Sequence, residues 1–202
     1  MIRTIVFDFG NVIGYFDHQR AIAELAAFTD MPPPELFAAI YGGRIEDDYE
    51  RNLLTTEQFV AAALAAGRLK CTPEQFLAAF VGIFWLNDEL AAFVPTLKPR
   101  YRLVLASNTN EAHFLRFREQ FKATLRHFDH LVVSHDAGAR KPNAAFFEYA
   151  QRFTGAERDE CLFVDDLSAN IAAAETFGWR GTVYRDFGRF RAELAEAGVS
   201  VL

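Results

Sequence analysis

The chain has 202 residues and a formal net charge of −6 at pH 7, with 21 basic and 27 acidic side chains. A chain with this acidic balance is not expected to be a general nucleic-acid or anionic-membrane binder. Its composition, 51% hydrophobic and 24% charged, predicts a folded domain with a sizeable core, and its two cysteines exclude a disulfide scaffold.

The first predicted element is a short buried strand over residues 4–7, which is halted by Asp8. This apolar run is too short for a secretory leader and has no basic region before it. The longest apolar stretch, residues 76–86, is far shorter than the ~20 residues that a membrane-spanning helix needs. Together with a cysteine usage typical of a reducing compartment, these features predict a soluble cytoplasmic protein.

Residues 18–87 show helical signals and no convincing strand. Two sequences with the spacing of a capping box, beginning at Thr55 and Thr72, mark the starts of helices. The apolar stripe over residues 76–86 is expected in the core of this segment. We therefore predict an inserted helical domain, with an α/β core formed by the two flanking parts, residues 1–17 and 88–202.

The rest of the chain alternates short apolar runs with helical patterns. The runs are typical of strands buried on both faces, and they cover residues 103–106, 131–133, 162–164 and 181–184. The intervening helical patterns cover residues 111–121, 144–153 and 169–177. This alternation predicts an α/β fold with three layers, in which a Rossmann-like parallel sheet lies between helices.

Polar side chains follow the predicted strands at the points where the strands end. In chain order they are Asp8, then Ser107 and Asn108, then Lys141 just before a helix, then Asp165 and Asp166. Ligands of an open parallel sheet bind beyond the carboxyl ends of its strands. We therefore expect three carboxylates, a hydroxyl and an ammonium group to converge at one edge of the sheet.

The expected convergence of three carboxylates calls for a cation. Two like charges ~4 Å apart repel by ~4 kcal/mol at an effective dielectric constant of 20, so three carboxylates would not all stay ionised alone. Mg²⁺ suits such a site, because it binds carboxylates, water and phosphate oxygens. A carboxylate facing a neutralised phosphoryl group can act as a nucleophile and form an aspartyl-phosphate that water then hydrolyses.

In this order, the four motifs resemble those of the haloacid dehalogenase-like hydrolases, which are mostly Mg²⁺-dependent phosphatases. The resemblance extends over nearly the whole chain. It implies that Asp8 is the nucleophile and a metal ligand, and that residues 18–87 are a helical cap that chooses the substrate. It further implies metal binding by Gly10 through its carbonyl, by Asp165 and by Asp166, phosphate binding by Ser107, Asn108 and Lys141, and a catalytic role for Lys141.

Gly10 departs from the family pattern, since most phosphatases of the family have an aspartate there that protonates the leaving oxygen. Loss of a positioned general acid typically reduces the rate by ~10² to 10⁴. Three outcomes stay open: Asp17 or a water molecule substitutes for the acid, the substrate has a leaving group that needs little protonation, or turnover is lost. The sequence over residues 8–13, with the later Asp17, is also similar to that of bacterial hexose-1-phosphate phosphatases, which favours a sugar 1-phosphate.

The leading functional prediction is therefore a Mg²⁺-dependent phosphatase whose partner is a small phosphate ester, with no nucleic acid or membrane partner. Two alternatives remain. One is a metal-free 2-haloacid dehalogenase, which uses the same kind of nucleophile, although Asp165 and Asp166 argue against a site without a cation. The other is a catalytically weak protein that binds a phosphorylated metabolite, with Gly10 as the sign of lost turnover.

Two further sets of residues have more than one interpretation. Asn170 is expected to brace the acidic loop after the fourth strand rather than to touch substrate. A segment of the predicted cap could face the active site or could form a solvated helix face, and its polar members are Arg44, Glu46, Asp47 and Tyr49.

Overall fold

A five-stranded parallel sheet lies at the centre of the molecule, and the computed structural model describes residues 1–200. The strand order is β5-β4-β1-β6-β7, and every neighbouring pair is parallel. The strands are β1 (Thr4–Phe7), β4 (Arg102–Ser107), β5 (His130–Val133), β6 (Cys161–Asp165) and β7 (Arg180–Val183). The predicted α/β fold is confirmed, and these strands match the five predicted runs closely.

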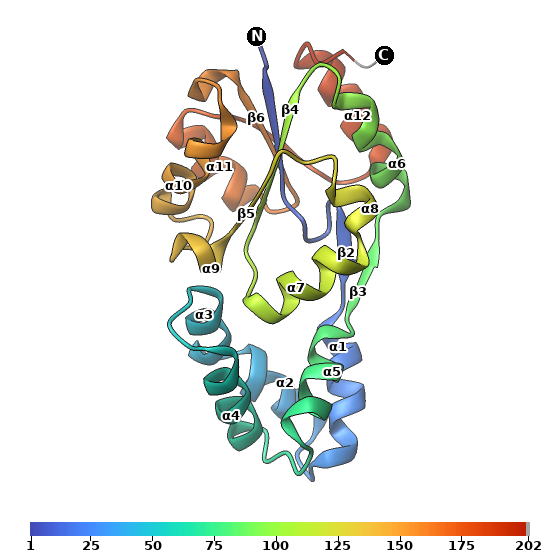
Figure 1. Cartoon of the computed structure of the whole chain (residues 1–202), viewed down its shortest axis with the longest axis vertical. Coiled ribbons are helices and arrows are strands. Elements are labelled where there is room, and N and C mark those ends of the chain that lie inside the picture. The colour runs from blue at the N-terminus through green and yellow to red at the C-terminus, as the bar shows by residue number, and fades with distance from the viewer. Residues whose placement is uncertain (201–202) are drawn as a thin grey trace.

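Helices cover both faces of this sheet, so the core has three layers (Figure 1). One face packs against α6 (Asp88–Leu97), α7 (Glu111–Gln120), α8 (Lys122–Leu125) and α12 (Phe187–Glu196). The other face packs against α10 (Ala144–Thr154) and α11 (Ser168–Phe177). The short helix α9 (Ser134–Ala137) and the 3-10 turn η2 (Arg158–Glu160) complete this part of the chain.

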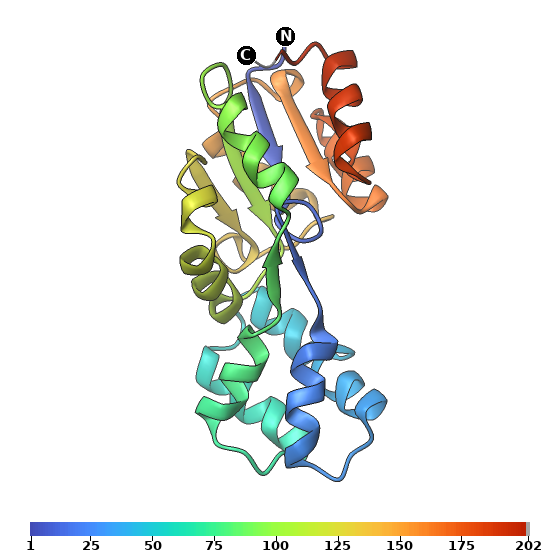
Figure 2. The ribbon, with the colours of Figure 1, turned by 90° about the vertical axis from the view of Figure 1, so that its right-hand side faces the viewer.

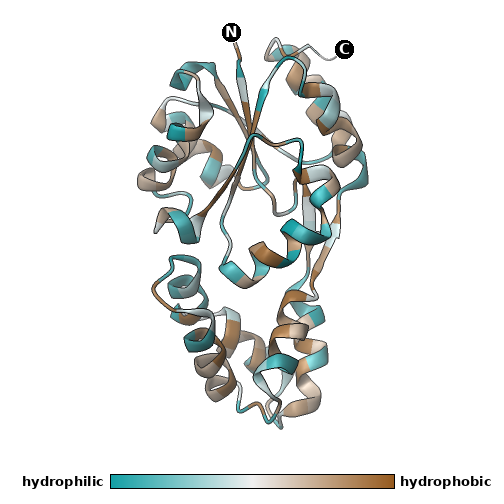
Figure 3. Cartoon of the chain, viewed as in Figure 1, coloured by the Kyte–Doolittle hydropathy of each residue, from teal (hydrophilic) through white to brown (hydrophobic). Residues whose placement is uncertain are grey.

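The central strand β1 shows why the sheet lies inside the protein. Ile5 and Phe7 pack into the apolar cluster on one face, while Val6 packs into the cluster on the other. All three side chains have no exposed surface. Because successive side chains of a strand point to opposite faces, an apolar run without alternation is what a strand between two helical layers requires. The sheet strands accordingly appear largely hydrophobic in Figure 3.

A separate bundle of helices follows the first strand and lies beyond one end of the sheet (Figure 2). It consists of α1 (His18–Leu25), η1 (Ala26–Phe28), α2 (Pro33–Tyr41), α3 (Arg44–Glu50), α4 (Thr56–Ala66) and α5 (Pro73–Val81). The predicted capping boxes at Thr55 and Thr72 are both formed. This helical segment, residues 18–81, has an apolar cluster of its own that includes Tyr49, Phe59 and Phe80.

Two short strands link the helical segment to the core. Strand β2 (Gly14–Phe16) pairs antiparallel with β3 (Phe84–Leu86). The prediction that residues 18–87 contain no strand was wrong at β3, because a three-residue strand is defined by its distant partner and not by local periodicity. The placement of the whole stripe 76–86 in the helical core was also wrong, since Phe84 packs with the sheet cluster and Trp85 is 39% exposed.

Within residues 1–200, no helix combines the length and the apolar character needed to cross a membrane.

Candidate active site

A buried lysine joins two of the predicted carboxylates. The ammonium of Lys141 lies 2.8 Å from Asp8 Oδ1 and 2.7 Å from Asp165 Oδ2. Lys141 is 4% exposed, Asp8 8% and Asp165 0%. Parallel pairing explains why the two carboxylates are neighbours. Phe7 is in register with Val164, so the residues that follow them, Asp8 and Asp165, lie side by side. A buried charge is tolerated only when it is paired and hydrogen-bonded, and Lys141 meets both conditions.

Asp165 is held by the loop that follows its own strand. Its Oδ1 accepts a hydrogen bond from the backbone N–H of Leu167 at 2.9 Å, and both of its oxygens accept from Asn170 Nδ2 at 3.0 Å. Asn170 therefore braces the acidic loop, in agreement with the sequence-based expectation. With Lys141 as a further donor, Asp165 orients the lysine, and it lies behind the residues that line the cavity.

Asp166 faces the cavity and is half-buried. Its Oδ2 accepts a hydrogen bond from Asn11 Nδ2 at 3.0 Å, and its backbone carbonyl accepts one from Arg185 at 2.8 Å. Asn11 has a φ of 54°, in the left-handed region that asparagine tolerates better than most residues. The turn after β1 therefore brings the Asn11 amide across to the loop after β6.

The three carboxylates together form a set of oxygen ligands suited to a divalent cation. One oxygen each from Asp8, Asp165 and Asp166 lies within 4.8 Å of the other two. Burial raises the pKa of Asp8 to about 7, and the charges of Asp165 and Asp166 add to this effect while Lys141 opposes it. One ammonium group thus does not balance the local negative charge. The oxygen-only ligand set and its excess negative charge fit Mg²⁺.

The turn after β4 holds the backbone that carries Lys141. Asn108 Nδ2 donates to the carbonyl of Lys141 at 2.9 Å, and Asn108 Oδ1 accepts from the Lys141 N–H at 2.8 Å. The Asn108 side chain is thus occupied in positioning Lys141. The N–H of Thr109 donates to Ser134 Oγ at 2.9 Å, so this N–H is already engaged within the protein. Ser107 and Asn108 both line the cavity.

Gly10 also lines the cavity, and the ring of Phe16 occupies the space beside it. A Cβ built on Gly10 would lie 2.8 Å from Phe16 Cε1, so any side chain here would require the ring to move. Asp17, considered above as a substitute acid, is not among the lining residues. Its carboxylate instead caps helix α1 by accepting from the N–H of Gln19 at 2.9 Å. The structure therefore places Asp17 in a capping role.

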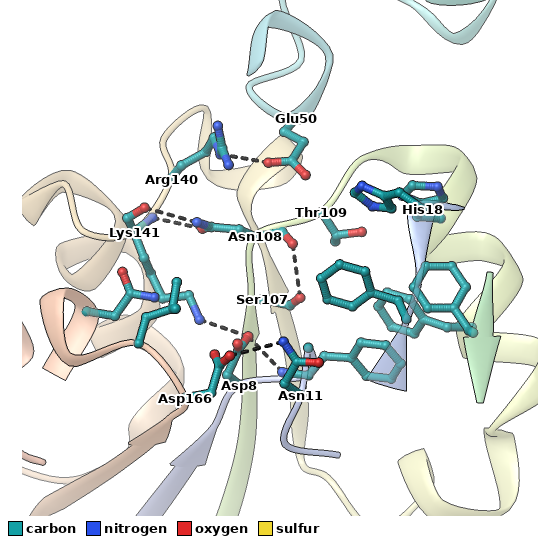
Figure 4. Close-up of a pocket in the computed structure, with 18 of the residues that line it drawn as sticks. Asp8, Asn11, His18, Glu50, Ser107, Asn108, Thr109, Arg140, Lys141 and Asp166 are labelled. Atoms are coloured by element: carbon teal, nitrogen blue, oxygen red, sulfur yellow. Dashed lines mark hydrogen bonds and ion pairs between the residues drawn. The ribbon is translucent and has the colours of Figure 1, made fainter. Parts of the chain in front are cut away.

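The cavity has a volume of about 330 Å³ and lies between the sheet edge and the helical segment. Figure 4 shows Asp8, Asn11 and Asp166 at one end, Glu50 with Arg140 at the opposite end, and His18 to one side. The lining also includes rings that contact one another, those of Phe16, Phe84, His113 and Phe117, and with His18 they form the aromatic side of the cavity. A cavity of this size suits a small ligand.

An ion-pair cluster connects the helical segment to the core at the end of the cavity remote from Asp8. Arg140 lies 2.6 Å from Asp47 and 2.6 Å from Glu50, both on helix α3. Glu46 and Glu50 are four residues apart and therefore share one face of α3. Of the four residues that could face the site, Glu46 lines the cavity, Asp47 pairs with Arg140, Tyr49 packs inside the helical segment, and Arg44 is exposed.

Two histidines of the lining are neutral at pH 7. Burial lowers the pKa of His18 to about 4 and that of His113 to about 3. The ring of His18 stacks on Tyr41 at a centroid distance of 4.1 Å, and His113 Nε2 lies 3.0 Å from the carbonyl of Phe80. Both histidines thus belong to the aromatic side of the cavity.

Reasoning from the sequence missed His18, His113 and Glu50, and it gave no role to Asn11 or Arg140. The spacing of Glu46 and Glu50 was a usable signal, since it puts both carboxyl groups on one helix face. Nothing in the sequence pattern indicates which helix face meets the cavity.

Comparison with known proteins gives consistent matches along the chain. The family model described as haloacid dehalogenase-like hydrolase matches residues 2–178. A D-ribitol-5-phosphate phosphatase of Bacteroides thetaiotaomicron is 26% identical over 200 residues, which cover 96% of this chain and 97% of that protein.

Two solved structures extend the match to the fold. A predicted HAD-like family hydrolase from Porphyromonas gingivalis has a TM-score of 0.83 at 25% identity, covering 99% of each chain. A HAD family enzyme from Bacteroides thetaiotaomicron, in complex with magnesium and inorganic phosphate, has a TM-score of 0.80 at 19% identity, covering 94% of this chain and 99% of that one.

Proposed function

The chain belongs to the haloacid dehalogenase-like hydrolases, and from this premise we propose that it is a Mg²⁺-dependent phosphatase of small phosphorylated metabolites. The observation that carries the proposal is the buried cluster of Asp8, Lys141, Asp165 and Asp166 at the edge of a ligand-sized cavity. The similarity to a D-ribitol-5-phosphate phosphatase over nearly the full length of both chains supports it.

Each residue of the cluster has a defined task in this proposal. Asp8 Oδ attacks phosphorus, so that an O–P bond forms to Asp8 and the bond to the leaving oxygen breaks. Lys141 and Ser107 bind the phosphoryl oxygens, and Asp165 keeps the lysine in place. Water then attacks phosphorus, releases inorganic phosphate and regenerates the Asp8 carboxylate.

Asp8, Asp166 and the carbonyl of Gly10 would hold Mg²⁺. Asp165, which the sequence also suggested as a ligand, already accepts hydrogen bonds from Lys141 and Asn170, so in this proposal it adds negative charge from behind the cavity wall. When bound, the ion neutralises charge on the phosphoryl oxygens and so permits an anionic nucleophile to approach. A nearby cation would offset the charges of Asp165 and Asp166 that raise the pKa of Asp8, so this pKa would fall and the carboxylate would be ionised at neutral pH. This charge balance also supports phosphate chemistry over metal-free dehalogenation.

The missing side chain at Gly10 restricts the leaving group. Of the four carboxyl groups that line the cavity, Asp8 and Asp166 belong to the metal cluster, and Glu46 and Glu50 lie on helix α3 at the other end. We therefore propose that no carboxylic acid protonates the leaving oxygen and that a water molecule or an acidic leaving hydroxyl serves instead. A sugar 1-phosphate releases a comparatively acidic anomeric hydroxyl, whereas a sugar-alcohol phosphate such as D-ribitol 5-phosphate does not.

A screen of phosphate esters tests this function. It should include sugar 1-phosphates, sugar 5- and 6-phosphates, ribitol 5-phosphate, nucleotides and aryl phosphates, each with Mg²⁺ and with EDTA. We expect phosphate release that needs Mg²⁺ and that falls steeply as the leaving group becomes more basic. A flat dependence on leaving-group basicity would contradict the role assigned to Gly10, and halide release from 2-chloropropionate without Mg²⁺ would contradict the phosphatase.

A further inference from the structure

The charged groups of the cavity differ between its two ends. The lining contains four carboxyl groups, from Asp8, Glu46, Glu50 and Asp166, but only two cationic side chains, Lys141 and Arg140. Lys141 is already paired with Asp8 and Asp165. At the end of the cavity that holds Asp8, this lysine and a bound Mg²⁺ would together offset the three carboxylates of the cluster and contact the phosphoryl oxygens.

The end of the cavity on helix α3 has no such balance. Arg140 is the cation there, and its guanidinium is neutralised by Asp47 and Glu50, each at 2.6 Å. Glu50 is 8% exposed, whereas the side chains of Arg140 and Asp47 are 35% and 40% exposed, so the Glu50 carboxylate is the member of the cluster that is shielded from solvent. An anionic group of a ligand would meet an arginine whose charge is already compensated, together with a further carboxyl group, that of Glu46. Charges that are compensated in this way attract a third charge only weakly.

The surroundings of the Glu46 side chain also disfavour negative charge at this end of the cavity. Its side chain forms no hydrogen bond or ion pair with any of residues 1–200, although it lines the cavity. Burial raises the pKa of Glu46 to about 8, with Glu50 adding to the effect and Arg140 opposing it. A protonated carboxyl group can both donate and accept a hydrogen bond, which suits a hydroxyl group. An environment that disfavours the ionisation of Glu46 also disfavours a negative charge on a ligand.

Besides these charged groups, the aromatic side of the cavity offers an uncharged surface. His18 is neutral at pH 7, and its ring lies beside that of Phe16, which in turn lies beside that of Phe84. The carbon chain of a polyol can pack against such rings while its hydroxyl groups bond to polar groups of the lining.

We propose that Glu46, Glu50 and Arg140 determine specificity by accepting a phosphate ester whose leaving group is a neutral polyol and rejecting one that carries a second negative charge. This inference rests on the proposed phosphatase activity and deepens it. It predicts that the substrate is a monophosphate of a neutral sugar or sugar alcohol, and that phosphorylated sugar acids and bisphosphates are excluded.

Pairs of esters that share a leaving oxygen test the proposal. α-D-Glucose 1-phosphate is compared with α-D-glucuronate 1-phosphate, and D-ribitol 5-phosphate with 5-phospho-D-ribonate, because each pair differs only in a remote hydroxymethyl or carboxylate group. We expect the neutral member of at least one pair to have a kcat/KM about tenfold or more above that of its acid.

Three variants then assign the selection to this cluster. Glu50→Gln leaves part of the Arg140 charge uncompensated, so the ratio of kcat/KM between the neutral ester and its acid should decrease about fivefold. Glu46→Arg adds a cation and should decrease this ratio further. Glu35→Gln removes the same charge from an exposed position of the helical segment outside the cavity, and should keep the wild-type ratio.

Equal kcat/KM values within both pairs would overturn the inference while leaving the phosphatase intact, and so would wild-type ratios in both Glu50→Gln and Glu46→Arg. If no ester releases phosphate, the proposed function fails and this inference fails with it. Thermal melts confirm that each variant is folded.

Discussion

The sheet edge and the helical segment contribute to the same cavity by different physical means. At the sheet edge, Asp8, Lys141 and Asp165 are almost fully buried and are fixed by several short contacts. On the helical segment, Glu46 is half-buried and forms no hydrogen bond or ion pair within residues 1–200. Groups that are fixed by ion pairs and hydrogen bonds suit the phosphoryl transfer that we propose. A side chain without such contacts, like that of Glu46, suits the recognition of leaving groups that differ in structure.

The strongest test of this contrast is removal of the proposed nucleophile. Asp8→Asn keeps the size of the side chain but removes the attacking carboxylate, so we expect kcat to fall about 10⁴-fold or more. Steady-state phosphate release with the best ester of the screen measures the effect. Asp136→Asn, at an exposed position of helix α9, is the matched control and should keep wild-type activity. Substantial turnover by Asp8→Asn would place the nucleophile elsewhere.

Removal of Lys141 should affect both activity and stability. Lys141→Met leaves the buried carboxylates of Asp8 and Asp165 without their shared ammonium, and breaking a buried pair in this way destabilises a protein by about 3 to 5 kcal/mol. Chemical denaturation without Mg²⁺ measures the loss. Lys122→Met removes an exposed ammonium and should change the free energy of unfolding by less than about 1 kcal/mol. Similar losses in the two variants would show that the buried cluster is not coupled as the structure indicates.

A pH series of unfolding experiments tests the burial of Glu46 in the part of the cavity wall that α3 forms, here called the helical wall. The pKa of Glu46 is raised from 4.5 to about 8 in the folded protein, so the folded state binds more protons than the unfolded state between these values. The contribution of this group to stability is therefore largest below pH 4.5 and declines as the pH rises to about 8.

Glu46→Gln removes this titration. Relative to the wild type, the variant should gain about 1 to 2 kcal/mol at pH 9 compared with pH 5, a range reduced for partial solvent screening. Glu35→Gln is again the control and should show no such pH-dependent gain. A wild-type pH profile in Glu46→Gln would mean that the Glu46 carboxyl is freely solvated.

The smallest expected effect concerns a contact between the two regions. The hydroxyl of Tyr49 accepts the N–H of Ala112 at 3.1 Å, at the start of core helix α7, and it also lies 2.8 Å from Thr56 Oγ1. Tyr49→Phe should lower the free energy of unfolding by about 1 kcal/mol, because a helix N–H loses its partner. Denaturant titration measures it, with Tyr149→Phe on α10 as the control. No change would indicate that water replaces the hydroxyl.

The two regions also differ in how far the sequence predicts them. The residues at the sheet edge were predictable because strand runs such as 103–106 and 162–164 carry a strong local signal, and parallel pairing then dictates that their carboxyl ends meet. The positions of Asp8 and Asp166, each directly after a strand, follow from that rule. The bracing of Lys141 by Asn108 was not predictable, since it depends on two loops approaching each other within hydrogen-bonding distance.

The helical wall was less predictable for a physical reason. The face that α3 turns toward the cavity depends on how the aromatic cluster around Tyr49 and Phe59 packs, and the two rings stack at a centroid distance of 4.4 Å. Local sequence gives the helix and its polar residues but not this packing. The strand β3 was missed for the same reason, because its partner β2 lies about 70 residues earlier in the chain.

Direct detection of phosphorus on Asp8 is the most direct test of the central claim. The enzyme is mixed with its best ester and Mg²⁺, quenched in acid during turnover, reduced with borohydride and digested for mass spectrometry. Reduction converts an aspartyl-phosphate to homoserine, so the account predicts homoserine at position 8 in this sample and aspartate there when EDTA replaces Mg²⁺. Steady phosphate release with only unmodified aspartate at position 8, and homoserine at another carboxylate, would contradict it.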